Sequence, residues 1–269
     1  MKFITSYRKY RKYKGVNLLK TIYINFKTQK FQDAIKLPIL VYGRLKIHSL
    51  SGTIKIEHKI EHGMIRLGLN TDCFSASKGS ALLNVCGILI FKGRFIASVD
   101  YTIDSGGVLS FGDLSALGNG VKIRCWHKIE IGKGFRCGVE SQIFDTNFHY
   151  TRNIYDGKIY PSQKEINIGN FCWIGNRATI MMGTCLPDYS IIAGNSLLNK
   201  DYTNGNPVSP LIAGAPGKII KTGVARVFSA IEEDKLNRFF KNNPEADFYQ
   251  GELGIIDESE AIEIFWRMV

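Results

Sequence analysis

The sequence lacks three features that would assign it to other classes of protein. No apolar run among its 269 residues is long enough to cross a bilayer. Its first 15 residues contain neither the apolar core nor the small-residue cleavage site of a secretory signal peptide. Its six cysteines include no CxxC pair, which disfavours disulfides and a zinc ribbon. We therefore expect a globular cytoplasmic protein whose cysteines are small buried residues.

Negative charge is missing from the start of the chain. No acidic residue precedes Asp33, and the whole sequence has 35 Lys and Arg against 24 Asp and Glu, a net charge of +11. Such an excess suits nucleic acid, anionic lipid or a phosphorylated small molecule, and the charge by itself does not choose between them. Tyrosines and aliphatic residues alternate with the early basic residues. We predict that residues 1–38 form a basic, helical segment that rests either on an anionic membrane or on the main body.

A repeat of six residues dominates the middle of the chain. From Ile166 the sequence reads INIGNF CWIGNR ATIMMG TCLPDY SIIAGN SLLNKD. The third residue of each hexad is a large aliphatic one, and the first is small in all but one case. The aliphatic series is Ile168, Ile174, Ile180, Leu186, Ile192 and Leu198.

Neither a helix nor a simple alternating strand produces a period of six. A solenoid does, if each coil consists of three short strands of about six residues that meet at tight corners. Coils would stack at the strand spacing of about 4.8 Å, so that backbone groups pair between neighbouring coils. We predict an all-β solenoid over residues 39–222, with less regular early coils and glycines that relieve the backbone at the bends.

Two polar segments interrupt the predicted solenoid. Residues 145–164 and 202–210 are rich in turn-forming residues and read as loops that leave a coil. After Gly223 the pattern becomes helical, so we predict that residues 223–269 form a helical cap on the last coil.

At this point the sequence resembles the hexapeptide-repeat acyltransferases, whose fold is a left-handed parallel β-helix. The run NIGNFCWIGNRATIMMGTCLPDYSIIAGNSLLNKD, followed by IAGAPGKIIK, resembles the hallmark region of that family. The element DTNFH resembles the Asp-x-x-x-His element of its sugar O-acetyltransferases. The resemblance implies left-handed coiling, a homotrimer with active sites between subunits, acetyl-CoA as donor and a sugar or polysaccharide as acceptor, with no nucleic acid.

Acyl transfer from a thioester to a hydroxyl requires a base, donors for the oxyanion and a slot for the donor. A histidine suits the first task because an imidazole titrates near neutral pH. By its place in the motif, His149 is the predicted general base. Asp145 and Asn147 are candidates for orienting the imidazole or binding the sugar, and for Asp145 a turn-capping role is equally compatible.

The resemblance also implies positions for the co-substrate. Backbone amides at Asn176 and Gly194 match those that contact the acyl-pantetheine arm, and Trp173 matches a residue that lines the slot. Three lysines are expected near the phosphates of CoA, namely Lys200, Lys218 and Lys221. Gly217 and Pro187 depart from the usual motif residues, and the insertion at 202–210 lengthens a loop near the expected adenine position.

Other functions remain open on the sequence. A hexapeptide-repeat enzyme could acetylate an amine, on an amino sugar or on serine, instead of a hydroxyl. Related solenoids bind zinc through three histidines, but no second histidine follows His149, so we expect no metal. A non-catalytic scaffold is a further alternative. The favoured prediction is an O-acetyltransferase of a surface polysaccharide or its precursor.

Overall fold

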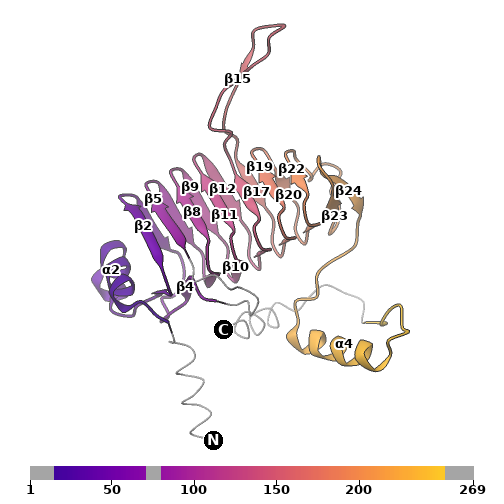
Figure 1. The fold of residues 1–269 in the computed structure, drawn as a ribbon, viewed down its shortest axis with the longest axis horizontal. Coiled ribbons are helices and arrows are strands. Elements are labelled where there is room, and N and C mark those ends of the chain that lie inside the picture. The colour runs from indigo at the N-terminus through magenta and orange to yellow at the C-terminus, as the bar shows by residue number, and fades with distance from the viewer. Residues whose placement is uncertain (1–14, 71–79, 252–269) are drawn as a thin grey trace, which may run out of the picture. The chain divides into compact units, whose positions relative to one another are not determined.

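The computed structural model describes residues 15–70 and 80–251. Within them, the strands form three long sheets of nine, seven and six strands and one two-stranded sheet. The chain visits the three long sheets in a fixed order, one strand in each, so successive coils stack side by side (Figure 1). Ile103, Ile123 and Ile143 pair in parallel register, which makes these coils 20 residues long.

We name the three long sheets in the order in which the chain reaches them. The first sheet contains β1 (Ile39–Val41), β4 (Ile65–Leu67), β7 (Phe95–Ala97), β10 (Ser115–Leu117), β13 (Arg136–Cys137), β18 (Trp173–Ile174), β21 (Ile191–Ile192), β23 (Leu211–Ala213) and β24 (Lys218–Lys221). The second sheet contains β2 (Leu45–Leu50), β5 (Ala81–Val85), β8 (Thr102–Ser105), β11 (Lys122–Cys125), β14 (Gln142–Phe144), β19 (Thr179–Met181) and β22 (Leu197–Leu198). The third sheet contains β3 (Thr53–Ile56), β6 (Ile88–Phe91), β9 (Val108–Phe111), β12 (Lys128–Ile131), β17 (Ile166–Ile168) and β20 (Cys185–Leu186).

The period of six is the inward-facing pattern of this solenoid. All six aliphatic residues of the predicted series are buried, from Ile168 to Leu198, and the first residue of every hexad is buried too. Phenylalanines fill the early coils instead, where the rings of Phe91, Phe95 and Phe111 pack together with centroids 4.6–5.8 Å apart. The predicted fold class, a left-handed parallel β-helix with helical segments at both ends, is confirmed.

The glycines that follow the aliphatic residues, Gly169 and Gly175, act differently from the prediction. The backbone turns with positive φ at residues such as Phe171, Arg177 and Asn195, so the left-handed residue of a corner need not be glycine. A Cβ at Gly169 would instead lie 2.6 Å from the backbone nitrogen of Asp188, in the next coil. Glycine is required there because neighbouring coils approach closely, and not because of the bend.

A helix covers the open edge of the first coil. The helix α2 (Leu18–Thr28) is capped by Asn17, whose side chain accepts a hydrogen bond from the backbone N–H of Lys20, and a short helix α3 (Phe31–Ala34) follows. Asn25 pairs with β1 as a strand would: its Oδ1 accepts from the N–H of Ile39 at 3.1 Å, and its Nδ2 donates to the carbonyl of Ile39 at 2.7 Å. Side chains of α2 thus satisfy the unpaired edge of β1.

The other end of the first sheet is closed by a hairpin. The strand β24 turns back and pairs antiparallel with β23, and the buried hydroxyl of Tyr202 donates to the carbonyl of Gly217 at 3.0 Å. The helix α4 (Ala230–Asn242) belongs to a second compact unit, which begins at Ala225. Its predicted role as a cap stays a prediction, and the second amphipathic stretch, residues 258–269, lies outside the described residues.

The described cysteines are free thiols, and their surroundings differ. Cys125, Cys137 and Cys172 are buried, and burial raises the pKa of the thiols of Cys137 and Cys172 to about 12. Cys86 is exposed, contrary to the expectation of a buried residue, and Cys73 lies outside the described residues. Among the described helices, none combines the length and the apolar character needed to span a bilayer.

Candidate functional site

The polar loop around FDTNFHY leaves the solenoid at the corner between the second and third sheets. The strand β14 ends at Phe144, and Asp145 follows with its side chain fully buried. One carboxylate oxygen accepts the backbone N–H of Trp126 and the other accepts that of His127, each at 2.8 Å. Asp145 therefore braces its own coil against the corner of the preceding coil.

A hairpin projects from this corner. Its arms contain β15 (Thr151–Arg152) and β16 (Ile159–Tyr160), which pair antiparallel and rise away from the stacked coils (Figure 1). The hairpin is tied at its root, where the N–H of Asn147 donates to the carbonyl of Ser162 at 2.8 Å. The side chain of Asn147 is exposed. The predicted loop, residues 145–164, is thus an ordered hairpin with a paired root.

Aromatic contacts fix the residue before the predicted base. Phe148 has a φ of +60°, and its ring meets those of Trp126 and Phe144 edge to face, with centroids 6.1 and 6.5 Å away. The guanidinium of Arg124 lies 5.7 Å from the centroid of the same ring. These three contacts hold Phe148 on the corner, so the exposed His149 follows an anchored residue.

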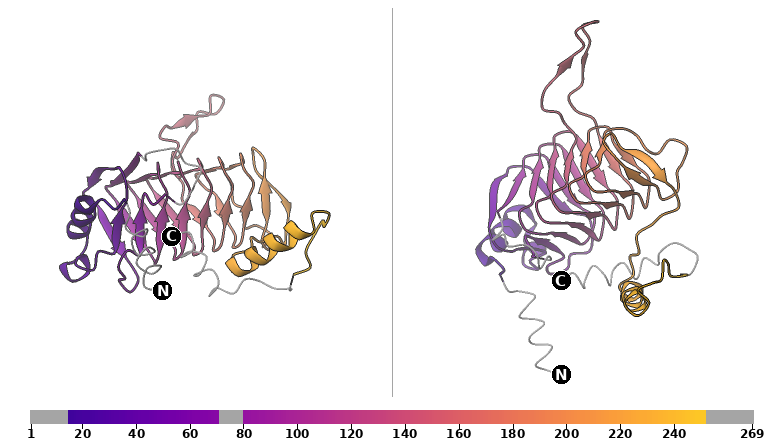
Figure 2. Two further views of the ribbon diagram at one scale, coloured as in Figure 1. Left: turned by 60° about the horizontal axis from the view of Figure 1, so that its bottom comes forward. Right: turned by 45° about the vertical axis from the view of Figure 1, so that its right-hand side comes forward.

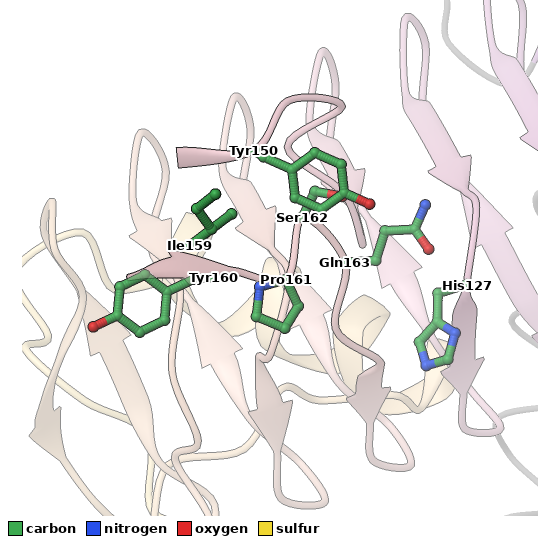
Figure 3. A pocket seen from close by; sticks show the side chains of 7 residues that line it. All are labelled: His127, Tyr150, Ile159, Tyr160, Pro161, Ser162 and Gln163. Carbon is green, nitrogen blue, oxygen red and sulfur yellow. The ribbon is translucent and has the colours of Figure 1, made fainter. Parts of the chain in front are cut away.

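A groove of about 510 Å³ lies beside the hairpin root. Figure 3 shows Tyr150, Ser162 and Gln163 gathered at the root, with His127 on the neighbouring corner. Tyr160 lies further along the hairpin. The groove is lined by His127, Tyr150, Ile159, Tyr160, Pro161, Ser162 and Gln163. It combines flat aromatic surface with amide and hydroxyl groups, the combination that small polar ligands bind.

Two of the predicted co-substrate residues meet at a different corner, between the first and second sheets. Asn176 and Gly194 occupy neighbouring coils, and the carbonyl oxygen of Asn176 lies 3.2 Å from the position of a Cβ on Gly194. The side chain of Asn176 accepts the backbone N–H of Val139 at 3.0 Å, so it ties two coils together. The structure brings these two positions together, and their predicted role in binding the co-substrate stays a prediction.

The other predicted co-substrate residues are spread along the solenoid. Trp173 lies on β18 with 39% of its surface exposed. Lys200 follows β22 at the same corner as the hairpin, two coils further on. Lys218 and Lys221 begin and end β24, and both are exposed. Within one chain, the predicted base and the Asn176–Gly194 pair therefore lie at opposite ends of the strands of the second sheet.

The sequence prediction assigned no role to His127 or Tyr160, although both line the groove. His127 precedes the hairpin, and nothing in its own neighbourhood resembles a motif. The feature that could have pointed to His127 is the coil length of 20 residues, which places His127 one coil before Asn147. Tyr160 comes near the groove because the hairpin folds back at residues 153–158. The six-residue repeat does not predict this reversal, because the hairpin lies outside the coils.

Within residues 15–70 and 80–251, no group of three or more His, Cys, Asp or Glu side chains is placed to hold a metal ion.

Comparisons with known proteins supply independent evidence. No protein-family model matches the chain. The chain is 26% identical over 145 residues to the "Putative lipopolysaccharide biosynthesis O-acetyl transferase WbbJ" of Escherichia coli (strain K12), which covers 50% of this chain and 72% of that protein. The predicted resemblance to the hexapeptide-repeat acyltransferases is confirmed.

Several solved structures are similar in part. The polySia-specific acetyltransferase NeuO is 17% identical with a TM-score of 0.43, covering 77% of this chain and 94% of its own. A hexapeptide-repeat acetyltransferase of Vibrio cholerae O1 biovar eltor, complexed with acetyl coenzyme A, is 19% identical with a TM-score of 0.35, covering 54% and 68%. A galactoside acetyltransferase in complex with coenzyme A is 12% identical with a TM-score of 0.35, covering 88% and 86%.

Proposed function

We propose that the chain is an acetyl-CoA-dependent O-acetyltransferase that modifies a sugar hydroxyl of a surface polysaccharide or its precursor. The observation that carries the proposal is the position of His149. It follows an anchored corner residue and precedes Tyr150, which lines an aromatic groove on a hexapeptide solenoid. The similarity to a putative lipopolysaccharide O-acetyltransferase supports the same reaction.

His149 acts as the general base in this proposal. Its imidazole accepts the proton of the acceptor hydroxyl while the hydroxyl oxygen attacks the thioester carbonyl. The new bond joins the sugar oxygen to the acetyl carbon, the bond from that carbon to sulfur breaks, and the imidazolium returns the proton to the leaving thiolate. Asp145 has a positioning role, because both of its oxygens already accept backbone N–H groups at the same corner.

The groove takes the acceptor. Tyr150 and Tyr160 offer flat surfaces on which a pyranose ring can lie, and Gln163 and Ser162 offer partners for its hydroxyls. Acetyl-CoA is the second substrate. The amide-rich corner at Asn176 and Gly194 suits the pantetheine arm, and Lys200, Lys218 and Lys221 supply positive charge for the phosphates.

The separation of these two parts supports the homotrimer that belongs to this proposal. The base and the pantetheine corner lie at opposite ends of the second-sheet strands of one chain. A site assembled between two copies would bring the base corner of one chain to the pantetheine corner of its neighbour. The proposal also keeps the predicted cytoplasmic location, where acetyl-CoA is available.

The test has two stages. Acetyl-CoA should raise the melting temperature of the protein, since a ligand that binds the folded state stabilises it. Release of the CoA thiol should then depend on an added polysaccharide, and the product should lose its acetyl group in mild alkali, as an ester does. His149→Ala should keep the thermal shift and lose transfer, whereas His58→Ala, an exposed histidine in an early coil, should keep both.

Each negative result has a separate meaning. A protein that shows no shift with acetyl-CoA is a scaffold and not a transferase. Transfer that persists in His149→Ala excludes His149 as the base. An alkali-stable product indicates an amine acceptor.

A further inference from the structure

The helix α2 buries one apolar and two polar side chains and leaves its other large apolar side chains exposed. Ile24 is completely buried, as are Thr21 and Asn25, which contact β1. On the opposite side, Leu18 and Leu19 are 67% and 83% exposed. A surface helix of a globular protein ordinarily buries its apolar stripe, whereas α2 buries only Ile24 of its large apolar residues.

The first coil of the solenoid explains the inward polar face. The strand β1 has no preceding coil, so its backbone groups need partners from outside the sheet. Asn25 satisfies the N–H and carbonyl of Ile39, and the hydroxyl of Thr21 accepts the N–H of Val41 at 3.0 Å. The pairing of β1 explains why the polar residues lie inward. It gives no reason for large apolar residues on the outer side.

The outer side of α2 continues onto α3. The rings of Phe26 and Phe31 meet edge to face with centroids 6.0 Å apart, which joins the two helices into one surface. We call this surface the N-terminal apolar face. Its exposed members are Leu18, Leu19, Ile22, Tyr23, Phe26, Phe31 and Ile35. Seven large apolar side chains gathered at one end of a protein indicate an interaction surface rather than scattered exposure.

Positive charge lies beside this face. Lys27 and Lys30 are exposed at the end of α2. The sequence of residues 1–38 contains ten Lys and Arg and one acidic residue, Asp33. Two copies of such a surface would repel each other, which disfavours self-association. A polyanion such as nucleic acid would leave the apolar side chains in water.

We propose that the N-terminal apolar face docks onto an anionic bilayer surface. A helix with apolar side chains on one side and lysines at its margin lies in the plane of a membrane interface, with its apolar side among the upper acyl chains and its lysines near the headgroups. Here the opposite side of the helix is bound to the first coil, so the solenoid is held at its N-terminal end (Figures 1 and 2). The hairpin emerges four coils further on, which leaves the groove accessible.

The experiment uses the full chain and sedimentation with vesicles. We expect binding to phosphatidylcholine vesicles that contain about 30% phosphatidylglycerol, and much weaker binding to pure phosphatidylcholine. The variant Leu19→Glu/Phe26→Glu should reduce binding by about tenfold or more, because both side chains would enter the apolar layer. Lys27→Glu/Lys30→Glu should reduce binding to the anionic vesicles and weaken its dependence on salt.

Matched controls distinguish docking of this face from misfolding and from a general effect of added negative charge. Ile154→Glu changes an apolar residue of the hairpin that is as exposed as Leu19, at 83%, and should bind vesicles as the unaltered protein does. Circular dichroism should show the same melting temperature for Leu19→Glu/Phe26→Glu, and thioester transfer to a soluble polysaccharide should be unchanged. Because transfer is measured separately from vesicle binding, failure of the docking proposal can be distinguished from failure of the proposed enzyme activity.

Three outcomes would overturn the proposal. The unaltered protein could fail to sediment with anionic vesicles. Leu19→Glu/Phe26→Glu could bind as well as the unaltered protein. A change in oligomeric mass on mutation of the face, measured by light scattering, would assign the face to contacts between copies of the chain instead.

Discussion

Asp145 and His127 lie in neighbouring coils, and the carboxylate of Asp145 accepts the backbone N–H of His127 at 2.8 Å. The other oxygen accepts the N–H of Trp126 at the same distance. The acidic residue of the DTNFH element therefore stabilises the corner beneath the proposed base. We therefore expect Asp145 to affect catalysis by holding the conformation of that corner.

Asp145→Ala should lower the free energy of unfolding by about 1–3 kcal/mol, because two partly buried N–H groups lose their acceptor. Asp145→Asn should also be destabilising. The amide NH2 group that replaces one carboxylate oxygen is a hydrogen-bond donor, and it would face a backbone N–H, which is also a donor. Urea unfolding measures both changes. Asp156→Ala removes an exposed hairpin carboxylate paired with Lys158 and should change stability by less than about 0.5 kcal/mol. Equal stability of Asp145→Ala and the unaltered protein would contradict the bracing role.

Phe148→Ala should reduce kcat by about ten- to a hundredfold, because His149 loses the neighbour that fixes its backbone. The KM for acetyl-CoA should change little, since Phe148 is not among the residues proposed to bind CoA. Phe148→Tyr keeps the contacts with Trp126 and Phe144 and should restore kcat. A rise in the KM for acetyl-CoA with unchanged kcat would show that Phe148 acts on co-substrate binding instead.

Gly169→Ala should destabilise the solenoid by about 1–3 kcal/mol, because the added methyl group meets the backbone of the next coil. A Cβ at this position would lie 2.7 Å from the carbonyl carbon of Pro187. Gly106→Ala is the matched control, since its Cβ would meet nothing closer than the ring of Trp126 at 3.6 Å. Thermal melting of the two variants should therefore differ clearly. Similar melting temperatures would contradict the close approach of coils as the reason for glycine.

Lys218→Ala/Lys221→Ala should weaken binding of acetyl-CoA by about three- to tenfold, because two exposed charges at the proposed phosphate position are lost. Binding of acetyl-pantetheine, which lacks those phosphates, should be unaffected. Lys92→Ala, an exposed lysine of an early coil, serves as the control. Calorimetric titration with both ligands distinguishes the outcomes, and equal weakening for both would place these lysines near the pantetheine arm.

The sequence predicted the solenoid from the hexads, and the structure confirms it down to the individual residues. Ile174, Ile180 and Ile192 face the core because each coil must fill its own interior, and that requirement repeats every six residues. The prediction explained Gly169 and Gly175 incorrectly. The need for Gly169 comes from Asp188 in the following coil, and a local pattern carries no information about which coil lies above.

What the sequence determined alone is therefore the local repeat, the break at DTNFHY and the positive charge at the start of the chain. Tertiary structure decided what these features contact. The partners of Asp145, the meeting of His127 with Tyr150 in one groove and the outward apolar side of α2 depend on distant segments. The physical reason is that hydrogen bonds and burial are formed between coils, about 20 residues apart, whereas the period of six is formed within each coil.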